Sequence, residues 1–405
     1  MIVQGTYGSA KVFAQDLEDG AREQIQTLLD QDFIEGATVR IMPDVHQGMG
    51  CVIGFTADMG DKVIPNIVGV DIGCGMLTVE LGNIAIDLPE IDSIISSSIP
   101  SGRNTHDRRT IEFARLEELH IWRELQDTRR IERSIGTLGG GNHFIEVGVD
   151  SQDKTYLVIH SGSRNLGTQV ARYYQNLAID LCSGKEELFT RRDHILETYK
   201  QQGRAQEIKS ALNLLAMEYK GLQPTYPRDL CFLTGKFRDR YLHDMKICQE
   251  YASLNREVMA DIILSKLLQR NLHEFPHFET VHNYISFEDN IIRKGAISAY
   301  EGEKVLIPIN MRDGSILATG KGNSDWNYSA PHGAGRVLSR TEAKKQLNMR
   351  SFKSDMEGIY STSVHKGTLD ESPSAYKPIA EILEAIGETV DVIDIIQPIY
   401  NYKAH

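Results

Sequence analysis

The sequence contains little cysteine and no long apolar run. Its five cysteines form no CxxC pair and are odd in number, which argues against a disulfide framework. The longest apolar stretches, such as residues 156–159, fall far short of the roughly 20 residues that a membrane-spanning helix needs. The first residues also lack the basic and apolar regions of a signal peptide. We therefore expect no membrane association and, by default, a cytoplasmic location.

Positive charge is also scarce. The chain has 44 basic and 56 acidic residues and a net charge of −12, which would repel nucleic acid. Binding of RNA or DNA would therefore require a local basic patch. One candidate spans residues 321–350 and has an excess of four positive charges. Its basic residues are Lys321, Arg336, Arg340, Lys344, Lys345 and Arg350, against the acidic Asp325 and Glu342.

The order of the expected elements indicates the fold class. Short β-like runs at 38–42, 51–55, 66–70 and 76–80 alternate with glycine turns. Charged and apolar residues over 108–133 are spaced as in an amphipathic helix, and residues 169–180 and 185–269 also have helical composition. Strand-like patterns return at 278–318 and 390–396. Strands, then helices, then strands, without regular alternation, favour an α+β fold with mixed sheets as a central core surrounded by helices.

Five possible metal ligands lie beside glycines or at the ends of expected strands. They are Asp71, Cys74, His143, His160 and His282. A carboxylate, a thiolate and imidazoles suit a first-row transition metal, and five donors with one bridging thiolate would suit two ions. Each donor also has a simpler interpretation, as a β-turn with a buried cysteine, a glycine turn before a strand, or a structural histidine. Sequence spacing does not show whether the five converge.

A second glycine-rich block surrounds another histidine. His332 is followed by Gly333, Gly335 and Arg336. Glycines let backbone amides face a phosphate and arginine neutralises it, so this histidine is a candidate general acid or nucleophile. The alternative is a capped loop leading into a basic helix at 341–347. The common phosphate-loop, dinucleotide and serine-hydrolase signatures are absent from the sequence.

Taken together, these blocks resemble one known family, the RtcB family of GTP-dependent RNA-splicing ligases. Six ordered motifs carry the resemblance, which extends from about residue 38 to Lys403. The motifs centre on Asp44 with His46, Asp71 with Cys74, Asn142 with His143, His160 with Arg164, His282 with Asn283, and His332 with Arg336. The resemblance implies one catalytic domain over residues 1–405, with a mostly helical insertion at about 185–275.

The resemblance also implies cofactors and roles. Two Mn²⁺ ions would share Cys74, with His143 and His160 completing one site and Asp71 and His282 the other. His332 would attack GTP and carry a guanylate. Arg164 and Arg336 would contact phosphates or RNA. The residues implied to hold GTP or GMP are Asn142, His143, Phe144, Ile145, Glu146, His282, Asn283, Pro308, Ile309, Asn310, Met311, Ser315, His332, Gly333, Ala334, Gly335 and Lys403.

The implied substrate is RNA, in tRNA splicing or RNA repair. A 3′-phosphate or 2′,3′-cyclic phosphate end would be joined to a 5′-hydroxyl end, and the resemblance leaves open an activating protein partner. Two alternatives remain from the residues: a metal-dependent phosphoesterase of RNA ends, and an RNA-binding accessory protein without turnover. The sequence departs from many members in the segment Pro308-Ile309-Asn310-Met311, where glycine and serine are frequent. It also ends in Tyr402-Lys403-Ala404-His405, not in the lysine-glycine of many members.

Overall fold

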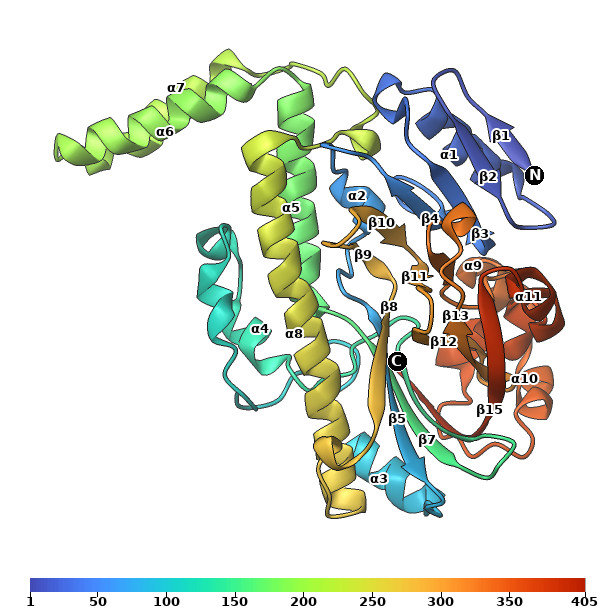
Figure 1. Cartoon of the computed structure of the whole chain (residues 1–405). Helices are drawn as coiled ribbons and strands as arrows, with labels where there is room; N and C mark the ends of the chain where they lie inside the picture. The colour runs from blue at the N-terminus through green and yellow to red at the C-terminus, as the bar shows by residue number, and fades with distance from the viewer. Residues whose placement is uncertain (405) are drawn as a thin grey trace.

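The computed structural model describes residues 1–404, in which two large β-sheets and one small sheet are surrounded by helices (Figure 1). The expected α+β class is confirmed. The C-terminal His405 lies outside the described residues. No helix within residues 1–404 is long and apolar enough to cross a membrane.

The central sheet has seven strands, and every neighbouring pair in it is antiparallel. Its buried faces are rich in Val, Ile and Leu, which suits strands that are covered on both sides. In spatial order the strands are β12 (Lys304–Asn310), β13 (Gly314–Gly320), β15 (Val390–Lys403), β6 (Phe144–Val149), β7 (Thr155–Ser161), β5 (Gly75–Gly82) and β8 (His277–Val281).

A second sheet has six strands, of which only the β2–β3 pair is parallel. Its strands, in spatial order, are β1 (Ile2–Gln4), β2 (Ser9–Val12), β3 (Val39–His46), β4 (Ile53–Asp58), β10 (Ile291–Lys294) and β9 (Asn283–Ile285). A third, two-stranded sheet pairs β11 (Ala296–Ser298) with β14 (Ser329–Pro331).

Two long helices, α5 and α8, run beside each other along one side of the sheets (Figure 1). Each has an apolar face buried against the core. The helices are α1 (Asp19–Leu29), α2 (Pro65–Val68), α3 (Leu88–Ser98), α4 (Thr128–Arg133), α5 (Arg164–Cys182), α6 (Glu186–Gln201), α7 (Ile208–Glu218), α8 (Gly235–Leu267), α9 (Arg340–Gln346), α10 (Met349–Asp355) and α11 (Ile379–Ile386).

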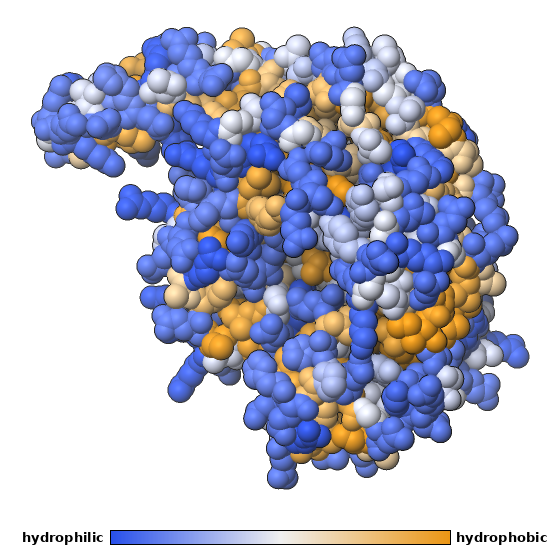
Figure 2. All heavy atoms as spheres, in the orientation of Figure 1, coloured by the Kyte–Doolittle hydropathy of each residue, from blue (hydrophilic) through white to orange (hydrophobic). Residues whose placement is uncertain are grey.

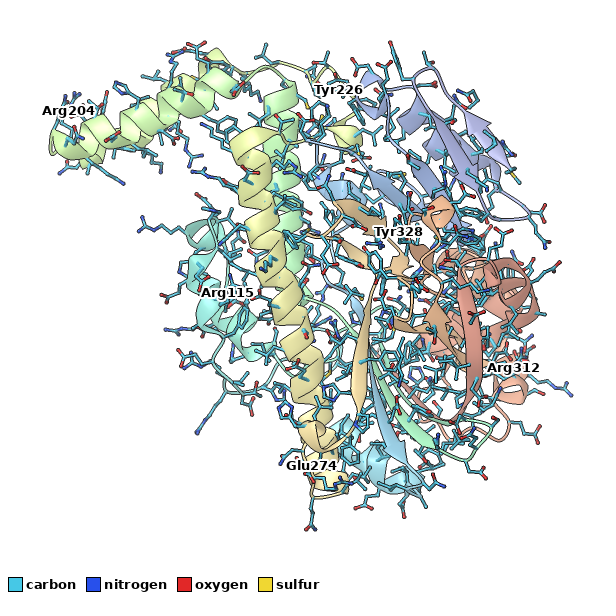
Figure 3. The ribbon with its side chains drawn as sticks, in the orientation of Figure 1. Arg115, Arg204, Tyr226, Glu274, Arg312 and Tyr328 are labelled. Atoms are coloured by element: carbon cyan, nitrogen blue, oxygen red, sulfur yellow. The ribbon has the colours of Figure 1, made fainter. Side chains whose placement is uncertain are left out.

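The helices α6 and α7 form an arm that extends away from the body, with Arg204 at its far end (Figures 1 and 3). The face of the arm shown in Figure 2 is mostly hydrophilic, although Leu214 and Met217 are exposed. Together with α8, the arm confirms that several helices occupy 185–269. The division of the chain into one domain with an insertion remains a prediction.

Two predicted elements were wrong. Residues 66–70, predicted as a strand, contain part of the short helix α2, whose first residue is Pro65; the fixed φ of proline suits that position. Residues 108–133, predicted as one amphipathic helix, form short 3₁₀ turns and only the six-residue helix α4. The backbone N–H groups of His120 and Ile121 donate to the Asp244 carboxylate at 2.9 and 3.3 Å, which replaces the bonds that a continuous helix would make.

Candidate metal centre and nucleotide cavity

The central sheet explains how donors that are far apart in the sequence meet. Strand β6 begins one residue after His143, β7 contains His160 near its end, β5 begins one residue after Cys74, and β8 ends one residue before His282. These four strands are neighbours in the order β6-β7-β5-β8, and neighbours run in opposite directions. Two strand beginnings and two strand ends therefore share one edge of the sheet. Asp71 lies on the turn that precedes β5.

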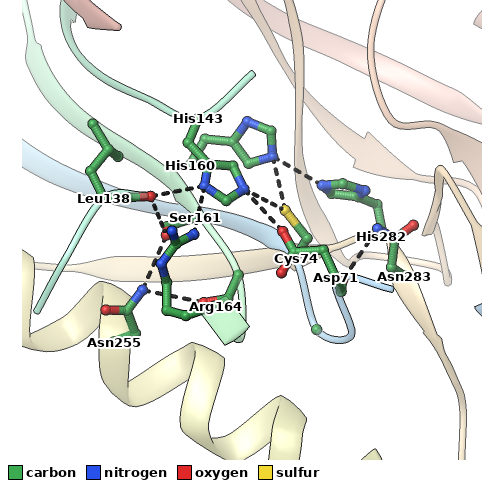
Figure 4. A network of polar contacts seen from close by, with 12 residues as sticks. Asp71, Cys74, Leu138, His143, His160, Ser161, Arg164, Asn255, His282 and Asn283 are labelled. Atoms are coloured by element: carbon green, nitrogen blue, oxygen red, sulfur yellow. Dashed lines mark hydrogen bonds and ion pairs between the residues drawn. The ribbon is translucent and has the colours of Figure 1, made fainter. Parts of the chain in front are cut away.

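The five predicted donors converge at this edge (Figure 4). The Cys74 sulfur is 3.4 Å from Nε2 of His143 and 3.3 Å from Nε2 of His160. Nε2 of His143 is 3.0 Å from an Asp71 oxygen, and Nε2 of His160 is 3.1 Å from Nε2 of His282. All but Asp71 are buried. The sequence-based hypothesis that these side chains lie together therefore agrees with the geometry.

The donors divide into two groups that share Cys74. One group contains Cys74, His160 and His282, and the other contains Asp71, Cys74 and His143, with the ligand atoms of each group within 4.8 Å of one another. The partition implied by the resemblance placed His143 with His160 and Asp71 with His282, which differs from this grouping. The neighbours of each donor depend on the turn at Asp71 and on the strand order β6-β7-β5-β8, and the strand order cannot be read from the sequence.

The chemistry of the donor set fits a bound cation. Burial lowers the pKa values of His160 and His282 well below the usual range, so both imidazoles are neutral near pH 7 and at most one of their facing Nε2 atoms need carry a proton. Burial, and then the Asp71 charge, raises the pKa of the Cys74 thiol. Burial also acts to raise the pKa of Asp71, but the hydrogen bond and charge of His143 and the Arg164 charge lower it to about 2. A divalent ion would stabilise the thiolate and satisfy both imidazoles.

Two polar residues of α8 position the loops that carry the donors, and sequence reasoning missed both. Arg256 is fully buried and donates to the carbonyl oxygens of Gly73 and Ser161 at 2.9 and 2.8 Å. Asn255 accepts from the backbone N–H groups of Gly136 and Thr137 at 2.8 and 3.0 Å. The helix therefore joins three donor-bearing segments, at Cys74, His143 and His160.

Arg164 closes one side of the donor cluster. Its Nη1 lies 3.1 Å from Nδ1 of His143, which is also 2.8 Å from the Leu138 carbonyl oxygen. The contact with the carbonyl places the proton on Nδ1 and leaves Nε2 as the ligand atom. The guanidinium occupies the position that a Cβ on Gly139 would take, at 1.6–1.9 Å, and Gly139 has φ +80°. The first glycine of the GGGNH motif is therefore needed for this arginine.

A cavity of about 300 Å³ lies beside the donors. It is in the size range of small-molecule sites. Of the residues predicted to hold the nucleotide, those that line it are Asn142, Phe144, Glu146, His282, Asn283, Pro308, Ile309, Asn310, Met311, Ser315, His332, Gly333, Ala334, Gly335 and Lys403. Ile145 does not line it, because this side chain faces the opposite side of β6 and is fully buried in a core cluster with Leu77 and Ile159. His143 contributes to the donor cluster rather than to the cavity wall.

His332 is held at the boundary between cavity and donors. Its Nδ1 lies 2.6 Å from Oδ2 of Asp44, whose side chain is fully buried. Its ring centroid is 4.8 Å from that of His282. Asp44 belongs to one of the motifs that carry the resemblance, but no pattern in the sequence indicated its role. The carboxylate fixes the Nδ1–H tautomer, so the lone pair of Nε2 is available as a nucleophile.

The wall opposite the donors carries a buried carboxyl group. Burial raises the pKa of Glu146 to about 7, although Asn401 and Lys403 act to lower it. Asn401 donates to Oε2 of Glu146 at 2.8 Å, and the buried Oε1 of Glu146 has no partner within the described residues. Lys403 pairs with Glu371 at 3.0 Å. The cavity thus presents one unsatisfied carboxyl oxygen.

The basic patch predicted at 321–350 is largely neutralised by acidic residues that follow it in the chain. Arg340 lies 3.0 Å from Asp370 and 2.9 Å from Glu371, and Arg336 lies 3.5 Å from Glu371. Lys344 pairs with Asp370 as well, and Lys321 with Asp391. The sequence window from 321 to 350 omitted these acids, so the patch has fewer unpaired cations than the sequence alone indicated.

Comparison with known proteins identifies the family. The family model described as "tRNA-splicing ligase RtcB" matches residues 24–126 and 110–404. The chain belongs to the RtcB family. It is 30% identical to the RNA-splicing ligase RtcB of Escherichia coli K12, over 96% of this chain and 95% of the relative. Identity to the tRNA-splicing ligase RtcB of Archaeoglobus fulgidus is 25%, over 95% and 91%. For the enzyme of that name from Nanoarchaeum equitans it is 25%, over 86% and 84%.

Proposed function

We propose that this chain is an RNA ligase that joins a 3′-phosphate or 2′,3′-cyclic phosphate end to a 5′-hydroxyl end, using GTP and Mn²⁺. The observation that carries the proposal is the position of His332. Asp44 orients its ring through a contact of 2.6 Å at Nδ1, and the ring centroid lies 4.8 Å from that of His282, a donor of the candidate metal centre. A nucleophile beside a cation site and at the wall of a nucleotide-sized cavity fits nucleotidyl transfer.

In the first step, Nε2 of His332 attacks the α-phosphorus of GTP. A P–N bond forms and the bond to the bridging oxygen breaks, so pyrophosphate leaves. Asp44 holds the Nδ1 proton and stabilises the positive charge that develops on the ring. Two manganese ions in the two donor groups would supply Lewis-acid stabilisation of the charge on the phosphate oxygens.

The later steps transfer the guanylyl group and seal the strand. An oxygen of the RNA 3′-phosphate attacks the guanylate, which releases His332 and gives an activated end. The 5′-hydroxyl oxygen then attacks that phosphorus, loses its proton, and displaces GMP. A 2′,3′-cyclic phosphate would first be opened by water. Arg164, 3.1 Å from His143, is placed to hold a phosphate of the RNA end beside the donors.

The preference for guanine rests on Glu146. Its buried Oε1 has no partner within the described residues, and Glu146 lines the cavity. Guanine carries an N1–H and a 2-amino group on one edge, which the carboxylate form of Glu146 can accept, whereas adenine offers an acceptor at N1. Because the pKa of Glu146 is about 7, guanine would bind with loss of the carboxyl proton, and the preference for guanine should strengthen as the pH rises above 7. A buried acceptor left unpaired disfavours the wrong base.

The test is incubation with α-labelled GTP and Mn²⁺. We expect a protein-bound label that is acid-labile and alkali-stable, as for a phosphoramidate, together with ligation of matched RNA ends. His332→Ala should abolish both. The control His194→Ala, which changes an exposed histidine on α6, should leave both unchanged.

Two outcomes would favour the alternatives. If the wild type opens cyclic phosphates but takes no label, and His332→Ala keeps that activity, the chain is a phosphoesterase. If it binds RNA but neither opens nor joins ends, it is an accessory protein. A label of equal strength on His332→Ala would overturn the assignment of the nucleophile.

A further inference from the structure

A second cavity, of about 700 Å³, adjoins the donor cluster. It lies between the turn at 121–127, the helix α4 and the N-terminal half of α5, which occupy the same side of the molecule in Figure 1. Four arginines line it: Arg103, Arg130, Arg164 and Arg172. We call it the arginine cavity. None of the family motifs described above, apart from Arg164, lies in it.

None of these arginines forms an ion pair within the described chain, although the charge of Arg164 acts on Asp71. No carboxylate of residues 1–404 lies within 4 Å of the guanidinium of any of the four. The two acidic residues of the lining are already engaged. Glu124 lies 3.9 Å from Arg192, outside the cavity lining, and the Asp127 side chain caps the N-terminus of α4. With Glu124 and Asp127 counted against the four arginines, the lining keeps a formal excess of two positive charges on a chain of net charge −12.

The arginine cavity leads to the donors through Arg164. That residue lines the cavity, and its Nη1 is 3.1 Å from Nδ1 of His143 (Figure 4). Tyr173, which is half-buried, also lines the cavity, and an aromatic side chain there could stack on an unpaired base. Guanidinium groups in series beside an aromatic ring match the phosphates and bases of a single strand.

We propose that the arginine cavity binds the phosphate backbone of an RNA strand and directs its end past Arg164 to the donor cluster. This inference rests on the proposed function, because it names the route by which the substrate reaches the same site. Both RNA substrates, the strand with the 3′-phosphate end and the strand with the 5′-hydroxyl end, have the same phosphodiester backbone, so either strand could bind in the arginine cavity. The basic patch at 321–350 does not compete as a route, since acidic residues already pair with most of its cations.

The experiment measures binding of two RNA decamers to the Mn²⁺-loaded protein over a range of salt concentrations. One decamer carries a 3′-phosphate and a blocked 5′ end, and the other carries a 5′-hydroxyl and a blocked 3′ end. The variant Arg130→Gln/Arg172→Gln removes two cations from the cavity. Arg22→Gln/Arg228→Gln removes two exposed arginines elsewhere and is the matched control. Arg130→Lys/Arg172→Lys keeps the charge.

We expect the glutamine pair to weaken binding of one decamer about tenfold at 0.1 M salt. The slope of log K against log salt should become shallower by about 1.4, since each phosphate contact to a single strand contributes roughly 0.7. The decamer that loses affinity identifies the strand. The lysine pair should retain most of the affinity and the full slope, and the control should match the wild type.

Unchanged binding of both decamers, or an equal loss in the control, would overturn the inference. Guanylation without RNA keeps this result separate from the proposed function. Guanylation should be normal in every variant. Its absence from the wild type would contradict the proposed function, not this inference. Arg130 also donates a hydrogen bond to the Arg103 carbonyl oxygen, so its replacement could disturb the local fold. Arg172→Gln alone removes no such hydrogen bond, and it should change the salt slope of RNA binding by about half as much.

Discussion

The Nδ1 atom of His332 lies 2.6 Å from a carboxylate oxygen of Asp44, although the two residues are 288 positions apart. Strand β3 of the six-stranded sheet carries Asp44, and His332 directly follows β14. Asp44 is fully buried, so its charge is not screened by water. The pair therefore sets both the tautomer and the orientation of the proposed nucleophile.

Asp44→Asn should slow guanylation by about a hundredfold or more, because the amide neither stabilises an imidazolium nor enforces the Nδ1–H tautomer. GTP binding should change little, since the Asp44 side chain does not line the cavity. Single-turnover labelling with GTP, alongside equilibrium binding, separates the two effects. A loss of binding with an unchanged labelling rate would show that Asp44 acts in another way.

Cys74 is shared by both donor groups, whereas His282 belongs to one. Cys74→Ala should therefore abolish binding of both Mn²⁺ ions, and His282→Ala should weaken one site and spare the other. Titration calorimetry with Mn²⁺ measures the stoichiometry. Two remaining sites in Cys74→Ala would refute a shared thiolate.

Gly139 and Gly141 form a matched pair, since both have φ +80°. A Cβ at Gly139 would meet the Arg164 guanidinium at 1.6–1.9 Å, whereas a Cβ at Gly141 meets nothing within 4 Å. Gly141→Ala should cost about 1 kcal/mol of unfolding free energy from backbone strain alone. Gly139→Ala should cost more and should also lower ligation by displacing Arg164. Equal effects of the two substitutions on ligation would contradict this role of the glycine.

Glu146 should make the free energy of unfolding depend on pH. Its pKa of about 7 in the folded protein exceeds the ordinary value of 4.5, so the folded state holds a proton that the unfolded chain releases. The stability that this group contributes is complete below pH 4.5 and is lost as the pH rises through 7. Between pH 5 and 7.5 the wild type should lose about 2–3 kcal/mol relative to Glu146→Gln in urea unfolding. Parallel pH profiles would contradict a protonated, buried Glu146.

Much of the fold follows from local patterns. The β-like run at 76–80 and the apolar run at 156–159 correspond to β5 and β7, and helical composition at 169–180 and 185–269 corresponds to parts of α5 and α8. The helix predicted at 108–133 failed because Asp244, more than a hundred residues away, takes the backbone N–H groups of His120 and Ile121. No local pattern reports a partner at that distance.

The candidate site was predictable in its members but not in its arrangement. The five donors stand out by residue type and by their glycine neighbours. Their division into two groups depends on the order β6-β7-β5-β8, which the sequence does not specify. Asn255 and Arg256 did leave a signal: they fall at helical spacing in the stripe formed by Ala252, Met259 and Ile263, where an apolar residue is expected. A buried polar pair on such a stripe indicates a structural network.

The most direct measurement of the central claim is anomalous diffraction at the manganese edge from crystals grown with Mn²⁺. The account predicts two peaks, both within coordination distance of the Cys74 sulfur. One should also contact His160 and His282, and the other Asp71 and His143. A single peak away from Cys74, or none at these side chains when Mn²⁺ is saturating, would contradict it.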